Sequence, residues 1–365
     1  MNSEVQPIRV ALKALCLFVV INVLYAMIDP QISGISLYNS IFPGRARMPF
    51  GEDAYTVMID DIDVMIASHE IAASKMPDEY RVALIGDSSI WGEHLPVRDT
   101  LSGQWNASGV KCGDRSIHFY NLGYPHPSVV KDLIVLDAAL EHEPDLIVWF
   151  VTLNTLTPRR LNPFMVANRE RAGALLGTYD IPFQHESALL EDKPSFYEKT
   201  LIGRKSYLAR FVKLQMLGAI WAATDADKAL LPKRKSPPLP DVKAKTRFKG
   251  KKPGSNLKKL MLFSALEAGH DIAGSIPILI VNEPIYIATG RNSDVRYNDG
   301  YPRWAYDQYR KAIANAAQKA GWNYLDLWDA IPKEHFASKS LYLSPKGEAL
   351  LMERIDPVMQ DMACK

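Results

Sequence analysis

The sequence has few cysteines and none of the compact motifs that identify common metal or nucleotide sites. It contains three cysteines in 365 residues, with no CxxC pair, HExxH motif, glycine-rich phosphate loop, calcium loop or internal repeat. We therefore expect neither a metal nor a cofactor. Cys16 lies in an apolar segment, which leaves Cys112 and Cys364 as the possible pair. No spacing motif joins these two, so their pairing stays open.

The chain as a whole also has no large net charge, but its charges are unevenly distributed along the sequence. The chain carries +2, whereas residues 228–259 hold 12 lysines and arginines against Asp241 alone, a local charge of +11 that leaves −9 elsewhere. Five prolines lie among these lysines, a composition that predicts an exposed basic arm. No helix-turn-helix, zinc-finger or aromatic-basic pattern accompanies it, so we expect no nucleic acid.

Only one hydrophobic run is long enough to cross a bilayer, Val10 to Ile28, although Lys13 and Asn22 interrupt it. Arg9 and Lys13 precede its apolar centre and Asp29 follows it, so the positive-inside rule places the N-terminus in the cytoplasm. No small-residue cleavage site follows the run, which favours a retained anchor over a removed signal peptide. The lack of an amphipathic face argues against the alternative of a buried core helix. The sequence thus predicts a single-pass bacterial membrane protein with a periplasmic or extracytoplasmic main domain.

Apolar runs of strand length recur along the rest of the chain, each followed by turn residues. They are continuous rather than alternating, which is typical of parallel strands covered on both faces. These runs are residues 81–86, 118–123, 145–151, 276–284 and 322–328. Helical patterns occupy 128–141, 301–321 and 344–355, where Ser344 and Pro345 form a good helix start. This alternation predicts a doubly wound parallel α/β sheet.

The same patterns predict a domain organisation. It comprises a cytoplasmic tip and anchor (1–30), a juxtamembrane stem (31–79), an α/β domain (80–356) and a C-terminal tail (357–365). A long insertion, about 155–260, contains an amphipathic helix at 204–224, which either covers the core or lies at the membrane surface. Residues 204–259 are the predicted contact for membrane-protein partners or anionic lipid, with simple solvation of the arm as the alternative.

Three residues with possible catalytic roles each follow one of the first three predicted strands. Ser88 follows the first in Gly86-Asp87-Ser88, Gly123 the second and Asn154 the third. Parallel strands bring such residues to one edge of the sheet. A serine nucleophile needs a base and donors for the oxyanion, and the Gly123 N–H and the Asn154 amide are candidate donors.

These three blocks resemble those of the SGNH (GDSL) hydrolase family over residues 80–355. The resemblance implies a flavodoxin-like α/β fold with Ser88 at the nucleophile position. It also implies an oxyanion hole formed by the N–H groups of Ser88 and Gly123 and by the side chain of Asn154. One departure is Thr152, which stands where the family usually has glycine.

The fourth block of the family, an acid three residues before a histidine, is altered here. The stretch "SLYLSPKG" aligns by its Leu343 to Gly347 segment, which puts Tyr342 at the histidine position and Lys339 at the acid position. A tyrosine hydroxyl is protonated at neutral pH and cannot accept the serine proton as an imidazole does. Lysine could act only if burial lowered its pKa by several units. Both substitutions predict loss of catalysis.

Other polar residues fall near the same predicted edge. Substitute bases are His335, Asp326 and Asp329, and histidines that could line the cleft are His94 and His126. A further polar cluster follows the fourth strand and could bind a carbohydrate or a partner loop. The alternative is a surface loop whose polar groups hydrogen-bond to one another. The members of the cluster are Asn282, Glu283, Arg291 and Asn292.

The sequence therefore supports two functions of different kinds. The first is a non-catalytic SGNH-hydrolase-like domain that serves as a scaffold or accessory subunit of a membrane or cell-envelope complex. The alternative is an active serine esterase or acyltransferase that acts on acylated envelope glycans through Ser88.

Overall fold

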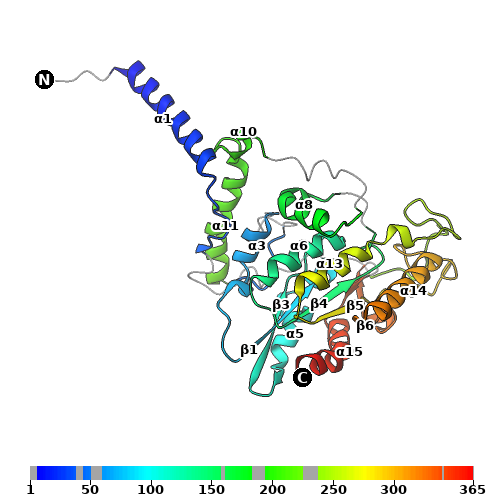
Figure 1. The fold of residues 1–365 in the computed structure, drawn as a ribbon. Helices are drawn as coiled ribbons and strands as arrows, with labels where there is room; N and C mark the ends of the chain where they lie inside the picture. The colour runs from blue at the N-terminus through cyan, green and yellow to red at the C-terminus, as the bar shows by residue number, and fades with distance from the viewer. Residues whose placement is uncertain are drawn as a thin grey trace.

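The computed structural model describes residues 6–37, 44–50, 60–157, 161–182, 194–224, 237–338 and 341–364, without the side chains of residues 221 and 222 (Figure 1). Over these residues the chain forms an α/β domain from which one long N-terminal helix projects.

The centre of the domain is a mostly parallel sheet. In the described part of the chain its strands are β1 (Glu79–Ile85), β2 (Lys111–Cys112), β3 (Arg115–Asn121), β4 (Leu146–Val151), β5 (Ile278–Asn282) and β6 (Asn323–Asp326). Their order is β2-β3-β1-β4-β5-β6, and every pair is parallel except β2 with β3. Without the short edge strand β2, this is the flavodoxin-like order. The predicted fold class is confirmed.

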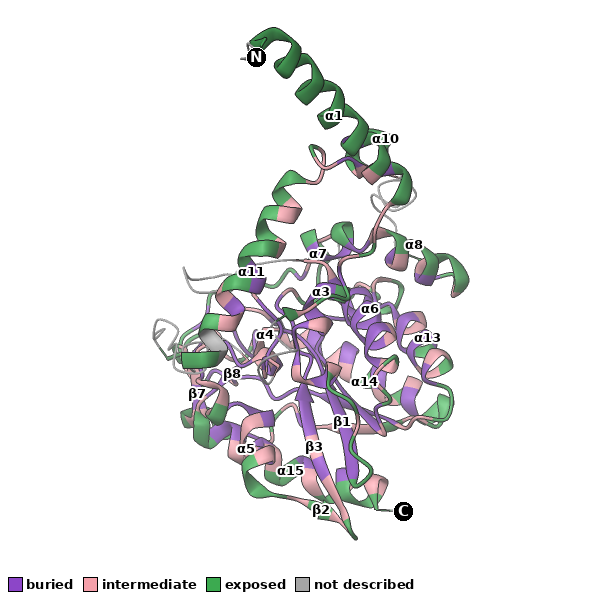
Figure 2. Cartoon of the chain, turned by 90° about the vertical axis from the view of Figure 1, so that its left-hand side faces the viewer, coloured by how far each residue is buried: buried purple, intermediate pink, exposed green. Residues whose placement is uncertain are grey.

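The sheet is buried on both faces, as the continuous apolar runs predicted. Alternate residues of β1 enter opposite cores: Ala83 and Ile85 belong to one, Val82 and Leu84 to the other. Both cores contain side chains from β4 as well, and Figure 2 shows the central strands as buried. The central strands β1, β4 and β5 are therefore mostly apolar at successive positions, and they show no alternating pattern.

Helices cover each face. The first face packs against α3 (Ile62–Ala67), α6 (Val129–Leu140), α13 (Phe263–Ala273) and α14 (Arg303–Ala320). The second packs against α5 (Leu101–Ser108) and α15 (Pro345–Ala363). As predicted, the Ser344 hydroxyl caps α15 by accepting the Gly347 N–H.

Two predicted boundaries differ from the structure. Met48, Ile62 and Ile71 are buried in the first core, so much of the predicted stem, residues 31–79, belongs to the α/β domain. The predicted tail begins at residue 357, yet α15 continues to Ala363 through Pro357, because Met359 on its inner face is fully buried.

The N-terminal helix α1 (Pro7–Ile28) is long and apolar enough to cross a membrane, and most of it stands clear of the domain (Figures 1 and 2). Beside its C-terminal end lies the short helix α10 (Phe196–Lys199), followed by α11 (Lys205–Thr224). The α11 helix matches the predicted amphipathic segment. Its Leu214 is buried in the core, whereas Val212 and Met216 are exposed.

Residues 237–259 of the basic arm run over the surface and are fixed at several points. Val242, Phe248 and Leu257 are buried, while most of the lysines around them are exposed. Figure 1 places this part of the arm on the side of the domain away from α1. The first residues of the arm, 228–236, lie outside the described residues.

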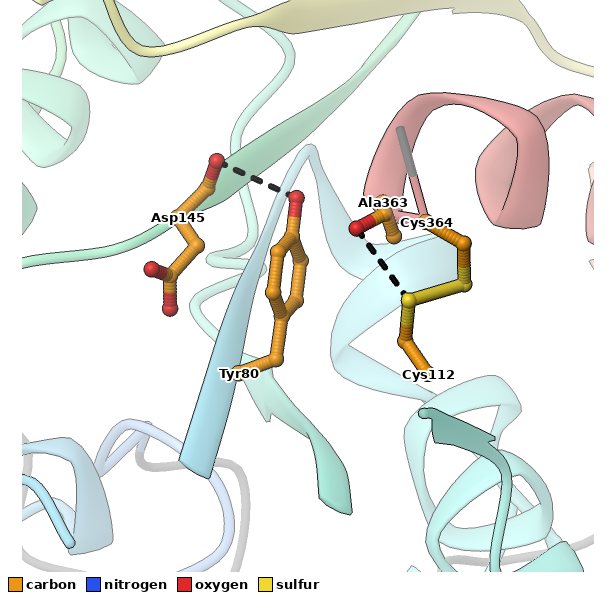
Figure 3. Close-up of a disulfide and its surroundings, with 5 residues drawn as sticks. All are labelled: Tyr80, Cys112, Asp145, Ala363 and Cys364. Atoms are coloured by element: carbon orange, nitrogen blue, oxygen red, sulfur yellow. Dashed lines mark hydrogen bonds between the residues drawn. A yellow bond between two sulfur atoms is a disulfide. The ribbon is translucent and has the colours of Figure 1, made fainter. Parts of the chain in front are cut away.

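A disulfide joins Cys112 of β2 to Cys364, just beyond α15, with the Cα atoms 5.3 Å apart (Figure 3). The bond connects the edge of the sheet to the end of the last helix. Nearby, the Tyr80 hydroxyl donates to the Asp145 carbonyl at 3.4 Å. The pairing that the sequence left open is therefore present. The two cysteines are 252 residues apart in the sequence.

Candidate functional site

Ser88 is the first residue of α4 (Ser88–Trp91), directly after β1. The turn is held by Asp87, whose carboxylate accepts the Ser89 backbone N–H at 2.9 Å and so caps the helix. Gly86 has no room for a side chain, since a Cβ there would lie 2.6 Å from the Ile90 Cγ1 atom. The local sequence thus fixes Ser88 at the carboxyl edge of the sheet.

The side chain that meets Ser88 is Tyr342. The two hydroxyl oxygens lie 2.8 Å apart, and the Tyr342 hydroxyl also contacts the Glu93 carboxylate through a very short hydrogen bond. Tyr342 is in β8 (Tyr342–Leu343), which pairs with β7 (Phe336–Ser338), and it is buried. The structure therefore places Tyr342 against the serine, where the family resemblance expects a histidine.

The donor and acceptor in each of these two hydrogen bonds follow from the carboxylate at one end. A carboxylate can only accept, so the Tyr342 hydroxyl donates to Glu93, and the Ser88 hydroxyl in turn donates to the Tyr342 oxygen. Burial, together with this hydrogen bond to Glu93, raises the pKa of Tyr342 above its ordinary value. Tyr342 is thus held in its protonated form, which could take the serine proton only by passing its own proton to Glu93.

His94 completes the cluster from the other side of Glu93. Its Nε2 lies 3.2 Å from the Glu93 carboxylate, and its ring packs edge-on against Tyr342 with 5.2 Å between centroids. The backbone of His94 is left-handed, with φ of 78°, an uncommon conformation for a residue other than glycine. His94 therefore contacts both Glu93 and Tyr342, and its predicted role in lining a cleft stays a prediction.

A second set of hydrogen bonds, among Ser89, Asp87 and Glu283, also holds this turn. The Ser89 hydroxyl oxygen lies 2.9 Å from Asp87 and 2.5 Å from Glu283, although a hydroxyl has one proton to donate. One of the two carboxyl groups must therefore be protonated. Burial, with the nearby Asp87 charge, raises the pKa of Glu283 well above its usual range. Glu283 thus donates to Ser89, which donates to Asp87.

A buried ion pair, Lys131 with Asp132 in α6, lies under the same edge. The Lys131 ammonium donates to the Gly86 carbonyl at 2.6 Å and to the Tyr124 carbonyl at 2.9 Å. These carbonyls follow β1 and β3 respectively. Both side chains of the pair are fully buried. Asp132 compensates the buried charge of Lys131, which would be costly alone. The two hydrogen bonds of Lys131 to the Gly86 and Tyr124 carbonyls hold the ends of β1 and β3 together.

The two predicted oxyanion donors share the edge with Ser88 but differ in their surroundings. Gly123 packs so closely on α4 that a Cβ would lie 2.5 Å from the Trp91 nitrogen, which explains the glycine. Its N–H donates to the Asn121 side chain at 3.1 Å. Asn154 lies in the turn after β4, the neighbour of β1, and is half-buried. The Gly123 N–H is therefore already engaged within the protein.

The structure describes three of the residues considered as substitute bases, and none of these three forms a hydrogen bond to Ser88. Asp326 accepts from Asn282 at 2.7 Å and from Arg310 at 2.7 Å, and Asp329 is exposed. The His335 carbonyl accepts the Ser344 N–H at 2.8 Å. Lys339 lies outside the described residues, and its assignment to the acid position stays a prediction.

His126, the other histidine near the predicted cleft, is partly exposed and packs against the rings of Phe50 and Tyr124. Burial, with the nearby Lys131 charge, lowers the pKa of its imidazole. It therefore carries less positive charge near neutral pH than an ordinary histidine.

The polar cluster predicted to bind a ligand divides into an inner and an outer half. Asn282 is fully buried and accepts the Tyr309 hydroxyl at 2.8 Å, and Glu283 is buried beneath Ser89. Both are engaged with partners inside the protein, and their predicted role in binding stays a prediction. Asn292 donates to the Val242 carbonyl at 2.8 Å, and Arg291 is exposed beside it. The outer pair thus contacts the basic arm.

Sequence reasoning missed the residues that connect the site. Glu93 is only five positions after Ser88, and this closeness in sequence was the available signal. The Lys131-Asp132 pair inside an otherwise apolar helix, "VVKDLIVL", was another, because charges in a buried helix need partners.

No protein-family model and no curated protein matches the sequence. Among solved structures, the chain is similar to a lipase/acylhydrolase from Enterococcus faecalis, with 15% identity, a TM-score of 0.40, and coverage of 77% of this chain and 96% of that one. It is also similar to a carbohydrate acetylesterase family member from Sinorhizobium meliloti, with 13% identity, a TM-score of 0.35, and coverage of 78% and 99%. At these values the similarity carries no argument, and the resemblance to the SGNH family stays a prediction from the strand order and the serine block.

Proposed function

We propose that this chain is a membrane-anchored, extracytoplasmic SGNH-hydrolase-like protein that acts by binding, as a scaffold or accessory subunit of a membrane or cell-envelope complex. The observation that carries the proposal is the hydrogen bond from Ser88 to Tyr342, whose own proton is committed to Glu93. A nucleophile in this position has a protonated phenol where it needs a base. The engaged Gly123 N–H supports the same conclusion, since it is not free to bind an oxyanion.

Two features support the proposed location. The helix α1 is long and apolar enough to cross a bilayer, and Arg9 and Lys13 near its start favour a cytoplasmic N-terminus. The Cys112–Cys364 disulfide fits an oxidising compartment, since such bonds are rare in the cytosol. Both features point to an α/β domain outside the cytoplasm.

Hydrolysis of p-nitrophenyl acetate by the purified full-length protein tests the proposal. We expect the wild-type rate to equal that of Ser88→Ala, because no group removes the serine proton. A rate that falls on Ser88→Ala would overturn the proposal. Isolation of the native protein from membranes provides a second measurement: a complex subunit should co-purify with the same membrane proteins at constant stoichiometry, whether Ser88 is present or replaced.

A second candidate is an esterase or acyltransferase on acylated envelope glycans, and the same hydrogen-bond chain is the observation that favours it. In this reaction the Ser88 oxygen attacks the acyl carbon while its proton moves to the Tyr342 oxygen and the Tyr342 proton moves to Glu93. The ester alkoxide then leaves with a proton returned through Tyr342. The hydrogen bonds from Ser88 through Tyr342 to Glu93 have the connectivity of a proton relay. Its terminal base is a carboxylate, which is a much weaker base than an imidazole. For this candidate, Tyr342→Phe should abolish any Ser88-dependent hydrolysis.

A further inference from the structure

The polar residue inside the candidate membrane helix has a partner in the α10–α11 corner, residues 195–204. Asn22 is buried, and its side-chain oxygen accepts the backbone N–H of Ile202 at 3.2 Å. Its side-chain nitrogen donates to the Phe18 carbonyl at 2.9 Å. Ala26, one turn further along, is buried on the same side of α1. The corner therefore packs against the apolar helix itself and not only against the residues that follow it.

The depth of this contact follows from helix geometry. Asn22 precedes Ile28, the last residue of α1, by six positions, which is about 9 Å along the helix axis. The 22 residues of α1 span about 33 Å, close to the roughly 30 Å hydrocarbon thickness of a bilayer. If α1 crosses the membrane, a segment that contacts Asn22 lies below the level at which the helix leaves the lipid.

The corner exposes apolar and aromatic side chains at this level. The exposed fractions are 55% for Phe196, 61% for Tyr197 and 38% for Ile202. Tyrosine collects at membrane interfaces, where its ring meets lipid and its hydroxyl meets water, and the side chains of Phe196 and Ile202 are wholly apolar.

The backbone of the corner is suited to an environment with little water. Ser195 and Glu198 form a reciprocal capping box, and the Thr200 hydroxyl accepts the Gly203 N–H at 3.0 Å. Gly203 permits the tight turn, since a Cβ would lie 2.1 Å from the Tyr197 carbonyl oxygen. Polar backbone groups near lipid need such internal partners.

The charges of the corner are also paired. Lys199 and Arg204 both contact the Asp29 carboxylate, at 2.8 Å and 2.6 Å, immediately after α1 ends. These cations lower the pKa of Asp29, so the pair persists at neutral pH. The bridge fixes the corner to the end of α1, and with Glu198, the other charged residue of the corner, the charges of the four groups sum to zero.

We propose that the α10–α11 corner is a membrane-embedded wedge: its side chains at 196, 197 and 202 insert at the boundary between headgroups and acyl chains of the outer leaflet beside α1. This gives the α/β domain a second attachment to the bilayer and limits its rotation about the anchor. The inference rests on the proposed membrane location of α1. A lipid surface, rather than a partner helix, is the occupant because the wedge packs directly on α1, most of whose apolar side chains are exposed, and presents Phe196 and Tyr197 at interfacial depth.

Fluorescence quenching in proteoliposomes tests the wedge. The full-length protein carries Cys16→Ala, keeps its disulfide, and receives one cysteine labelled with an environment-sensitive dye at Phe196, at Tyr197, at Leu24 in α1, or at Leu239 in the basic arm. Leu24 and Leu239 are both exposed, so they are matched controls for lipid and for water. We expect spin-labelled phosphatidylcholine to quench positions 24, 196 and 197 severalfold more than 239, and aqueous iodide to give the reverse order.

Each other pattern overturns the inference in a distinguishable way. Quenching by lipid at 24 but not at 196 and 197, with iodide access as at 239, would show that α1 spans the membrane while the corner stays in water. Protection of 196 and 197 from both quenchers would show that protein, such as a second copy of the chain, covers the corner. Loss of lipid quenching at 24 as well would refute the membrane location itself.

Discussion

Tyr342→Phe removes one hydroxyl and with it both hydrogen bonds of the Ser88 cluster. The bond to Glu93 involves a charged acceptor that is almost entirely buried, and such bonds contribute about 1.5–3 kcal/mol. The bond from Ser88 is between neutral groups, one of them half-exposed, and contributes about 0.5–1 kcal/mol. We therefore expect the free energy of unfolding of Tyr342→Phe to fall by about 2–4 kcal/mol.

Chemical denaturation of the detergent-solubilised protein, followed by tryptophan fluorescence, measures this change. Tyr197→Phe is the matched control, because that hydroxyl is on an exposed side chain and its removal should change stability by less than about 0.5 kcal/mol. A double-mutant cycle with Glu93→Gln isolates the pair, and we expect a coupling energy of about 1–3 kcal/mol. A coupling energy near zero would refute the assignment of the Tyr342 proton to Glu93, and with it the physical basis of the proposed loss of catalysis.

Three other changes probe the surrounding structure. Replacing Cys112 and Cys364 together by serine should lower the free energy of unfolding by about 2–4 kcal/mol, measured by denaturation under non-reducing conditions, since the bond closes a long loop; an unchanged midpoint would contradict this. Gly123→Ala should shift α4 and destabilise the fold by about 1–3 kcal/mol, because a Cβ would lie 2.5 Å from the Trp91 nitrogen, whereas Gly177→Ala in α8 (Arg169–Thr178), with open space around it and no positive φ, should cost less. Burial raises the pKa of Glu348 to about 8, so the folded protein binds a proton that the unfolded chain releases near pH 4.5, and stability should fall as pH rises from about 4.5 to 8. Glu348→Gln should flatten this fall, and an equally steep pH profile in the variant would disprove the assignment.

Much of the fold could be predicted because it depends on local patterns. The parallel strands β1, β4 and β5 are buried on both faces, so they appear in the sequence as largely apolar runs, and the start of α15 is fixed by Ser344 and Pro345. The two-residue strand β2 carries no such signal, because Lys111 and Cys112 lie at an edge and are not buried. The end of α15 was predicted too early because Pro357 marks a helix end in most sequences, whereas here packing of Met359 sustains the helix.

The site could be predicted only in part, for a related reason. The positions of Ser88, Gly123 and Asn154 follow from strand ends, which topology brings to one edge. The partner of Ser88 depends on β8 approaching from 254 residues away, and the role of Glu93 depends on that approach. Asn282 and Glu283 looked like surface residues because polar side chains usually are, yet hydroxyl partners from α14 and α4 allow them to be buried.

The disulfide between β2 and the residue after α15 also has a mechanical consequence. It closes residues 112–364 into one covalent loop, so tension applied through α1 and through anything attached after Cys364 bypasses β4, β5 and β6. Only the chain before Cys112, including β1, can be drawn out. A protein anchored in a membrane and loaded at its other end would therefore lengthen by less than a third of its contour, and reduction of this one bond would remove that limit.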